Sequence, residues 1–191
     1  MAFLTEEQIE SMGFKSVGEN TLLSDKASYY NCKNISIGNN VRIDDFVVLS
    51  AGIDGIEIGN YIHIAVFSSL IGAGKIILRD FCNISSKVSI YSSNDDYSGE
   101  YMTNPMISSE FTNVTHGAVS VGKHVIIGSG SVILPNVILE DGVAVGALSL
   151  VTKSCTEFSV YIGVPAKKIK ERKRDLLELE KKLNRAKALV S

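Results

Sequence analysis

The stretch VSVGKHVIIGSGSVILPNVILEDGVAVGALSLVTKS, residues 119–154, places an aliphatic residue at every sixth position. The aliphatic positions are Val121, Ile127, Ile133, Leu139, Val145 and Val151. A spacing of six matches neither the 3.6-residue period of a helix nor the alternation of a single strand. It indicates short strands joined by corners, with three strands to each coil of a triangular parallel β-helix. Glycine often follows the aliphatic residue, and we expect it to relieve an unusual φ at the corner.

The same spacing extends toward the N-terminus. Groups of three hexads begin at Val17, Ile37, Ile58 and Leu78, which lie 20, 21 and 20 residues apart. With the stretch above they predict about six coils, which at about 4.8 Å per coil make a prism roughly 25–30 Å tall. A β-sandwich fits less well, because hairpin turns do not recur at this spacing. The period alone leaves the hand of the coil open.

Three segments are expected along the chain. Residues 1–15 form a short N-terminal helix, with Thr5 as its N-cap and Gln8 completing a capping box. Residues 16–162 form the β-helix, and residues 91–118 are inserted as a loop where the repeat stops at Ile90. Residues 163–191 form a turn and an amphipathic helix. The loop is rich in Asp, Ser, Asn and Tyr, and it supplies polar groups that a flat prism wall lacks.

The composition is that of an ordinary soluble domain. The 191 residues are 45% apolar and 21% charged, with a net charge of -2, which disfavours nucleic acid or an anionic membrane surface as partner. No apolar run approaches the roughly 20 residues of a membrane span, and the start carries no secretory signal. The three cysteines are scattered and no zinc-type cluster exists, so we expect a cytoplasmic protein without a bound metal.

The repeats, followed by IGVPAKKIKER at residues 162–172, resemble the hexapeptide-repeat (left-handed β-helix) acyltransferases. Within that family the chain looks most similar to the sugar acetyltransferases of surface-polysaccharide synthesis, and the similarity covers roughly residues 15 to 175. The resemblance implies a left-handed coil, acetyl-CoA as acyl donor, and a homotrimer with active sites between neighbouring subunits.

Two groups of residues are candidates for catalysis. Family members that acetylate hydroxyls usually place a catalytic histidine at the start of the long loop, where this chain has Asp95 followed by Asp96. These carboxylates are candidate bases, or else turn residues that cap local amides. His63 is the third candidate, with Arg42 and Asn83 at the same register one coil to either side. The three predict a polar column that binds substrate, or else an ordinary solvated corner.

Other loop residues are candidates for sugar binding, namely Tyr97, Tyr101 and His116. Because Asp95 ends one face of the prism and His63 lies on another, one chain does not bring them together. We expect the Asp95 loop of one subunit to face the His63 column of its neighbour.

The resemblance also implies a coenzyme A groove beside the last coils. There, backbone amides would hold the pantetheine and the thioester oxygen, lysines would meet the phosphates, and a proline and an alanine would flank the adenine. The candidate residues are Gly128, Ser129, Gly146 and Ala147 for the amides, Lys153, Lys167 and Lys168 for the phosphates, and Pro165 and Ala166 for the adenine. Each lysine is otherwise a solvated charge.

The leading hypothesis is an acetyl-CoA-dependent transferase that acetylates a sugar, foremost the amine of a nucleotide-linked amino-deoxy sugar. A neutral amine is a good nucleophile and needs less from a base than an alcohol does, which suits a site without the loop histidine. O-acetylation of a saccharide hydroxyl and a non-catalytic β-helix scaffold remain alternatives. A carbonic-anhydrase-like metal site is disfavoured, because His63, His116 and His124 lack a shared coil spacing.

Overall fold

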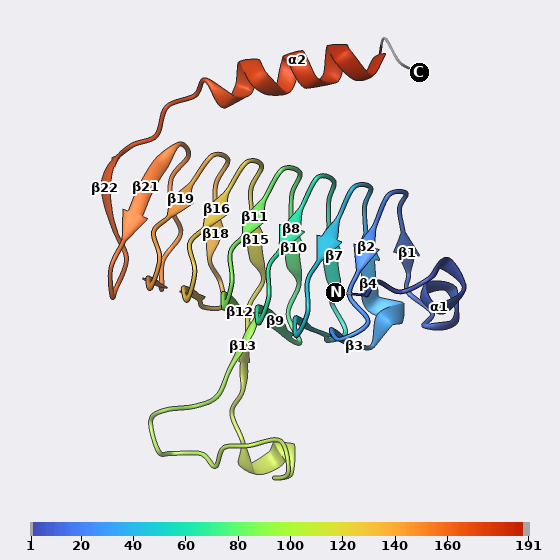
Figure 1. The fold of residues 1–191 in the computed structure, drawn as a ribbon. Helices are drawn as coiled ribbons and strands as arrows, with labels where there is room; N and C mark the ends of the chain where they lie inside the picture. Colours follow the sequence, from blue (N-terminus) through green and yellow to red (C-terminus); the bar gives the residue numbers. More distant parts are fainter. Residues whose placement is uncertain (1, 189–191) are drawn as a thin grey trace.

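The computed structural model describes residues 2–188, so Met1 and residues 189–191 of the predicted terminal segments lie outside the described part. Figure 1 shows a prism of stacked coils, with a short helix at its N-terminal end, a loop projecting from one edge and a long helix lying along another edge. The prism has three walls, each a mainly parallel sheet.

The three walls are named here face 1, face 2 and face 3, and each gains one strand per coil. Face 1 contains β1 (Ser16–Val17), β4 (Ile35–Ile37), β7 (Ile56–Ile58), β10 (Ile76–Leu78), β15 (Val119–Val121) and β18 (Ile138–Leu139). Face 2 contains β2 (Leu22–Leu23), β5 (Arg42–Ile43), β8 (His63–Ile64), β11 (Asn83–Ile84), β16 (Ile126–Ile127), β19 (Ala144–Val145), β21 (Ser159–Ile162) and β22 (Lys167–Glu171). Face 3 contains β3 (Ser28–Tyr30), β6 (Val48–Ala51), β9 (Ser69–Gly72), β12 (Ser89–Tyr91), β17 (Val132–Ile133) and β20 (Leu150–Val151).

The predicted β-solenoid is confirmed, and the structure extends it beyond six coils. A seventh coil begins at the parallel bridge between Cys155 and Leu139 and continues with β21, which pairs in parallel with β19, and β22 then turns back antiparallel to β21. This coil was not predicted, because the antiparallel hairpin of β21 and β22 ends the repeat.

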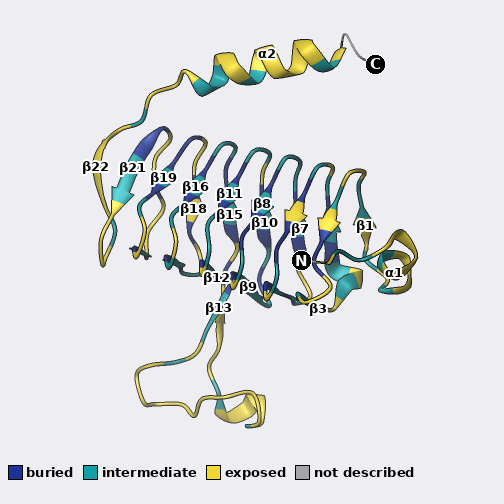
Figure 2. Cartoon of the chain, viewed as in Figure 1, coloured by how far each residue is buried: buried dark blue, intermediate teal, exposed yellow. Residues whose placement is uncertain are grey.

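The core is a stack of equivalent aliphatic side chains inside the prism. On face 2, Ile43, Ile64, Ile84 and Ile127 pair in register, and each is fully buried. Figure 2 shows dark-blue buried segments that recur along the coils, between teal and yellow ones. Since a coil alone leaves its inward residues open above and below, burial of apolar area favours stacking.

The corner glycines have a different role from the expected one. Gly38 and Gly128 do not have positive φ; a Cβ on Gly38 would lie 2.6 Å from the Gly59 carbonyl oxygen of the next coil, and one on Gly128 would lie 2.5 Å from the Ala147 nitrogen. The left-handed conformation falls instead on bulkier corner residues, such as Phe46 and Tyr61. Glycine is therefore required for the close approach of coils rather than for its φ.

The repeat is interrupted by a loop with a two-stranded stem. β13 (Ser93–Asn94) and β14 (Thr115–His116) pair antiparallel, and the short 3-10 helix η2 (Ser109–Phe111) lies between them along the chain. Figure 1 shows the loop projecting away from the prism below β12. The loop therefore places its polar side chains beyond the wall of its own coil stack.

Helices occupy both ends of the chain. α1 (Glu6–Ser11) begins with the predicted capping box, in which Thr5 Oγ1 accepts from the Gln8 amide at 3.3 Å and Gln8 Oε1 accepts from the Thr5 amide at 2.8 Å. A second 3-10 turn, η1 (Cys32–Asn34), follows β3. Among residues 2–188, no helix has the length and apolarity needed to cross a bilayer.

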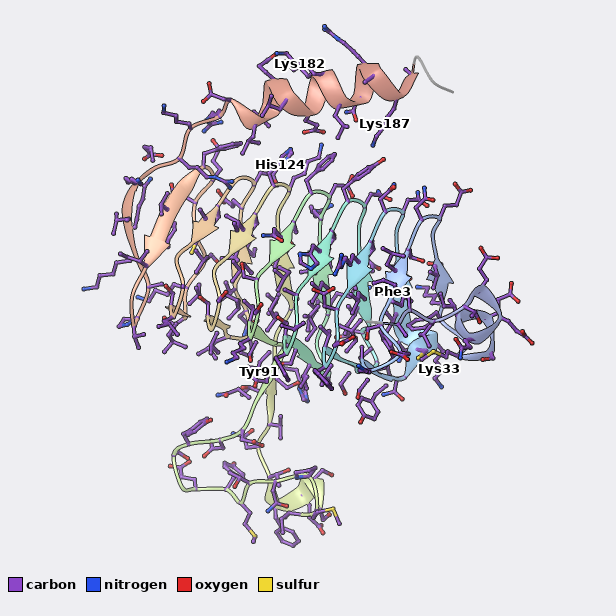
Figure 3. All side chains as sticks on the ribbon, viewed as in Figure 1. Phe3, Lys33, Tyr91, His124, Lys182 and Lys187 are labelled. Carbon is purple, nitrogen blue, oxygen red and sulfur yellow. The ribbon has the colours of Figure 1, made fainter. Side chains whose placement is uncertain are left out.

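The C-terminal helix α2 (Leu176–Ala188) lies along the corner between faces 1 and 2 (Figures 1 and 3). The rings of Tyr61, Phe81 and His124 stack at this corner, with centroids 5.1 and 4.8 Å apart. Glu180 of α2 accepts hydrogen bonds from Lys123 and, at 2.6 Å, from His124 Nε2. Charged contacts with the corner therefore hold the helix to its own prism.

Candidate functional site

The first part of the site is the polar column on face 2. Arg42 pairs in register with His63, and His63 with Asn83, so the predicted column is present; its role in substrate binding stays a prediction. At its N-terminal end, Asp44 Oδ1 accepts from Arg42 Nε at 2.7 Å, and Asp44 Oδ2 lies 2.8 Å from His63 Nε2. Arg42, Asp44 and His63 form what is called here the Asp44 cluster.

In the Asp44 cluster, a buried carboxylate is paired with two more exposed basic groups. The Asp44 side chain is 8% exposed, whereas those of Arg42 and His63 are 48% and 42% exposed. Burial by itself raises the pKa of Asp44, but hydrogen bonds from Arg42 and His63 outweigh it and hold that pKa below its usual value. Asp44 is therefore ionised at neutral pH and fixes the orientation of both partners.

Sequence reasoning missed Asp44. The residue that follows the inward aliphatic side chain of face 2 forms a line along the corner between faces 2 and 3, called here the corner line. Its members in successive coils are Ser24, Asp44, Ala65, Ser85, Gly128 and Gly146. Asp44 could have been found from the sequence, because it is the one ionisable side chain at this position in these six coils.

The second part of the site is the start of the loop. Asp95 directly follows β13; it is exposed, and its carboxylate makes no hydrogen bond or ion pair with any of residues 2–188. Asp96 instead accepts from the Ser98 hydroxyl and amide and from Asn113 Nδ2 at 3.4 Å. The Ser98 hydroxyl first, and then these other donors, hold the pKa of Asp96 below its usual value, which makes it a weaker base. The geometry favours Asp95 as the reactive carboxylate.

The remaining loop candidates are His116, Tyr97 and Tyr101. His116 lies across the stem from Ser93, with its Nδ1 2.8 Å from the Ser93 hydroxyl, and Ser93 precedes Asp95 by two residues. Tyr97 is 86% exposed and Tyr101 is 46% exposed, so a large part of each side chain is open to solvent. Both rings are available for contact with a substrate or a second subunit.

The predicted coenzyme A residues cluster around the last coils. The amides of Gly128 and Gly146 donate to Val145 and Tyr161 carbonyls in the ladder, each at 2.8 Å. Within residues 2–188, the amides of Ser129 and Ala147 make no such bond and remain available to a ligand. This geometry favours Ser129 and Ala147 as donors to a thioester oxygen.

The lysine candidates lie on the C-terminal hairpin and nearby. Lys167 and Lys168 begin β22 and are exposed, and Lys168 pairs with Glu171 at 2.6 Å. Pro165 and Ala166 precede them, and the Ala166 amide donates to Leu150 at 2.8 Å, which ties this turn to face 3. Lys153, just past β20, is also exposed. Binding of coenzyme A by these residues stays a prediction.

Metal ligands do not gather in the described part of the chain. Among residues 2–188, no group of three or more His, Cys, Asp or Glu side chains is placed to hold a metal ion.

Known proteins with similar sequence and structure identify the family. The chain is 63% identical, over 94% of its length and 94% of the relative's, to the dTDP-4-amino-4,6-dideoxy-D-glucose acyltransferase of Escherichia coli. It superimposes on AntD, an N-acyltransferase from Bacillus cereus bound to dTDP and coenzyme A, with a TM-score of 0.93 and 47% identity over 96% of this chain and 98% of that chain. The chain belongs to the left-handed β-helix acyltransferases. No family model matches it.

This membership confirms the predicted fold, the left-handed coil and the use of an acyl-CoA donor. A more distant relative of this acyltransferase is WbbJ of Escherichia coli K12, which is named for O-acetyl transfer in lipopolysaccharide biosynthesis; it is 32% identical over 73% of this chain and 69% of its own. Another structure of AntD contains dTDP and 3-hydroxybutyryl-CoA, with a TM-score of 0.92 and 47% identity over 99% of this chain and 98% of that chain.

The AntD structures also point to a serine that sequence reasoning missed. They include variants of one serine and one aspartate ten residues apart in AntD. In this acyltransferase Ser85 and Asp95 have that spacing, as do Ser86 and Asp96. Ser85 lies on the corner line, one coil from Gly128, and its amide donates to the Ile127 carbonyl at 3.0 Å. The Ser85 hydroxyl is therefore near the predicted thioester end of the site.

Proposed function

We propose that this acyltransferase transfers the acetyl group of acetyl-CoA to the 4-amine of dTDP-4-amino-4,6-dideoxyglucose. The observation that carries the proposal is the 63% identity to a relative named for that substrate, which extends over 94% of both chains. A structure of AntD with dTDP-4-amino-4,6-dideoxyglucose and coenzyme A supports it. The loop carboxylate that stands where a histidine is expected for hydroxyl acceptors also agrees with an amine.

The reaction needs few groups from the protein. The neutral amine attacks the thioester carbonyl carbon, a C–N bond forms, and the C–S bond breaks to release coenzyme A. Asp95, which has no hydrogen-bond or ion-pair partner among residues 2–188, accepts the proton that the amine loses, and that proton passes to the departing sulfur or to water. The free amides of Ser129 and Ala147 stabilise the oxyanion, and the Ser85 hydroxyl orients the carbonyl or the amine.

The active site is proposed to lie between subunits of a homotrimer. Ser85 lies at the corner between faces 2 and 3, whereas Asp95 follows the far end of face 3. The corner beside the corner line also exposes apolar side chains: Phe46 is 50% exposed, Phe67 is 55% exposed, and their rings stack 5.0 Å apart. A second copy that docks on this corner buries both rings and brings its Asp95 loop to Ser85 and the His63 column.

The cellular setting of the proposal follows from the substrates. Acetyl-CoA and nucleotide-linked sugars are cytoplasmic metabolites, and an N-acetylated amino sugar on dTDP is a donor for assembly of surface polysaccharide such as lipopolysaccharide. The likeness to WbbJ supports this setting. It also keeps O-acetylation of a saccharide hydroxyl as the second candidate function.

The decisive experiment measures thiol release from acetyl-CoA with a panel of acceptors. The panel contains dTDP- and UDP-linked 4-amino sugars, the matching dTDP-sugar with a hydroxyl in place of the amine, and simple galactosides. Rapid release with the dTDP-4-amino sugar, and N-acetylation of the product by mass spectrometry, is the expected result. Release with the hydroxyl sugar alone would support O-acetylation, and no release together with no coenzyme A binding would favour a scaffold.

A further inference from the structure

The exposed imidazole of His116 is anchored to the prism by a chain of two hydrogen bonds. The Ala73 amide, which directly follows β9, donates to the Ser93 hydroxyl oxygen at 2.8 Å. The same oxygen lies 2.8 Å from His116 Nδ1 across the stem of the loop. A solvated histidine needs no such anchor, because water can satisfy both ring nitrogens. The chain therefore holds one orientation of a ring whose outer edge is open to solvent.

The donors and acceptors of this chain decide which ring nitrogen carries a proton outward. A serine hydroxyl donates one proton, and the Ser93 oxygen already accepts from the Ala73 amide. If His116 Nδ1 donated to Ser93, the Ser93 proton would have no acceptor among residues 2–188, so Ser93 donates to Nδ1 of the neutral ring. The proton of that ring is then on Nε2, which has no hydrogen-bond partner among the same residues. His116 therefore presents a fixed N–H donor at the start of the loop.

We propose that His116 Nε2–H donates a hydrogen bond to the C3 hydroxyl of the dTDP-4-amino sugar, and that Ser93 is the positioning residue that holds the ring. This inference rests on the proposed function and assigns one sugar substituent to one side chain. In dTDP-4-amino-4,6-dideoxyglucose the C3 hydroxyl is the polar neighbour of the reacting C4 amine. The start of the loop then recognises both groups, since Asp95 accepts from the amine and His116 donates to the hydroxyl.

The stem keeps His116 within reach of the substituent beside the one that Asp95 contacts. Ser93 and His116 are partners in the antiparallel ladder, and Asp95 follows Ser93 by two residues. Paired Cα atoms lie about 4.5–5.5 Å apart and two residues span at most about 7 Å, so the Cα atoms of His116 and Asp95 are no more than about 12 Å apart. The two side chains and their hydrogen bonds cover that separation with two neighbouring ring substituents between them.

A purely structural role for the Ser93–His116 hydrogen bond makes a different prediction. The stem has another side-chain bond, in which the Thr115 hydroxyl donates to the Asn94 carbonyl at 3.3 Å. A bond that only closed the stem would affect all sugar acceptors alike. A donor to the C3 hydroxyl instead affects only acceptors that carry this hydroxyl, so the preference between two sugars separates the two roles.

The first test compares kcat/KM for dTDP-4-amino-4,6-dideoxyglucose and for its 3-deoxy analogue, with acetyl-CoA as donor. The wild-type protein is expected to prefer the sugar with the C3 hydroxyl about tenfold, because the analogue leaves the His116 donor unpaired. His116→Ala is expected to lower kcat/KM for the natural sugar about tenfold and to keep that for the analogue within about threefold of wild type. Ser93→Ala releases the ring and loses part of the preference. His116→Gln keeps an N–H donor and retains part of it.

Thr115→Val is the matched control in the same strand. It removes the other side-chain bond of the stem and keeps the branched shape of the side chain. Its preference for the natural sugar is expected to equal that of the wild-type protein. Because Thr115 and His116 are both exposed, the melting temperatures of Thr115→Val and His116→Ala are expected to stay within about 2 °C of wild type.

The second test measures binding of the same two sugars by calorimetry, with no coenzyme A present. The wild-type protein is expected to bind the natural sugar about tenfold more tightly than the analogue, and His116→Ala to bind the two equally. An undiminished preference in His116→Ala, or a wild-type protein that does not distinguish the two sugars, would overturn the inference. Failure of the proposed function looks different, since the wild-type protein would then release no thiol with either sugar. The binding preference would still decide the role of His116, and no binding of either sugar would overturn it too.

Discussion

Replacement of Asp95 by asparagine tests the proposed base most sharply. The substitution keeps the shape of the side chain and removes its charge. Since Asp95 is exposed and makes no hydrogen bond or ion pair with residues 2–188, the melting temperature is expected to change by less than about 2 °C. Loss of a general base typically costs a factor of about 10² to 10⁴ in rate. Because an amine needs less help than an alcohol, we expect the lower end, a fall in kcat of about a hundredfold.

Asp96→Asn is the matched control for Asp95→Asn. Asp96 already accepts hydrogen bonds from Ser98 and Asn113, and an asparagine retains one acceptor oxygen for Ser98. Its kcat is therefore expected to fall by no more than about threefold. The assay is thiol release from saturating acetyl-CoA at pH 7.5 with the dTDP-4-amino sugar. Equal losses in the two variants, or a rate in Asp95→Asn within about threefold of wild type, would refute the role of Asp95 as base.

Three further perturbations test the assembly, the C-terminal helix and the corner glycines. Phe67→Asp places a charge on the exposed corner, and we expect monomers in sedimentation velocity and loss of activity; a trimer would count against the proposed interface. Glu180→Gln removes a carboxylate whose pKa is lowered by hydrogen bonds from Lys123 and then His124, so it is expected to cost about 1 kcal/mol at pH 7. This loss of stability arises from the ionised carboxylate of Glu180. It is therefore fully present above the unfolded pKa of about 4.3 and disappears as the pH falls through the lower pKa of the folded state. A stability difference between variant and wild type that grew in acid would contradict this reasoning. Gly38→Ala is expected to destabilise the protein by about 1–3 kcal/mol in thermal or urea unfolding, despite its ordinary φ, and a neutral result would show that the coils can separate.

A control for the assembly prediction lies on another corner. Leu179 is 62% exposed on α2, which lies along the corner between faces 1 and 2, away from both the corner line and the Asp95 loop. Leu179→Asp is expected to remain a trimer with full activity. Dissociation of this variant would show that charge at any corner disrupts the assembly.

The coil architecture could be predicted because each inward position must be filled in every coil. Ile43, Ile64 and Ile84 recur at coil spacing, and that spacing fixes the register that also aligns Arg42 with His63. The polar column was therefore visible in the sequence. The prediction of an amine as the acyl acceptor came from Asp95, which stands where hydroxyl-acetylating relatives have a histidine.

Other features depend on side-chain geometry that a repeat pattern does not encode. The hydrogen bonds of Asp44 to Arg42 and His63 require its corner side chain to extend along the wall of the prism. The hexad pattern predicts only whether a side chain points into the prism or out of it. The true role of Gly38 required the distance to the neighbouring coil. The proposed pairing of Asp95 of one subunit with Ser85 of its neighbour is a property of the assembly, since a single chain places the two residues at different ends of face 3.

A mixed-trimer experiment tests the central claim that each active site is shared between two subunits. Each variant alone, Asp95→Asn or Ser85→Ala, is expected to be nearly inactive. Equal amounts of the two variant proteins are then mixed, unfolded and refolded together. Random assembly of a trimer places an intact Ser85 opposite an intact Asp95 at about a quarter of the interfaces, so about a quarter of the wild-type rate is predicted. A mixture that stays as inactive as its two components would contradict the shared site.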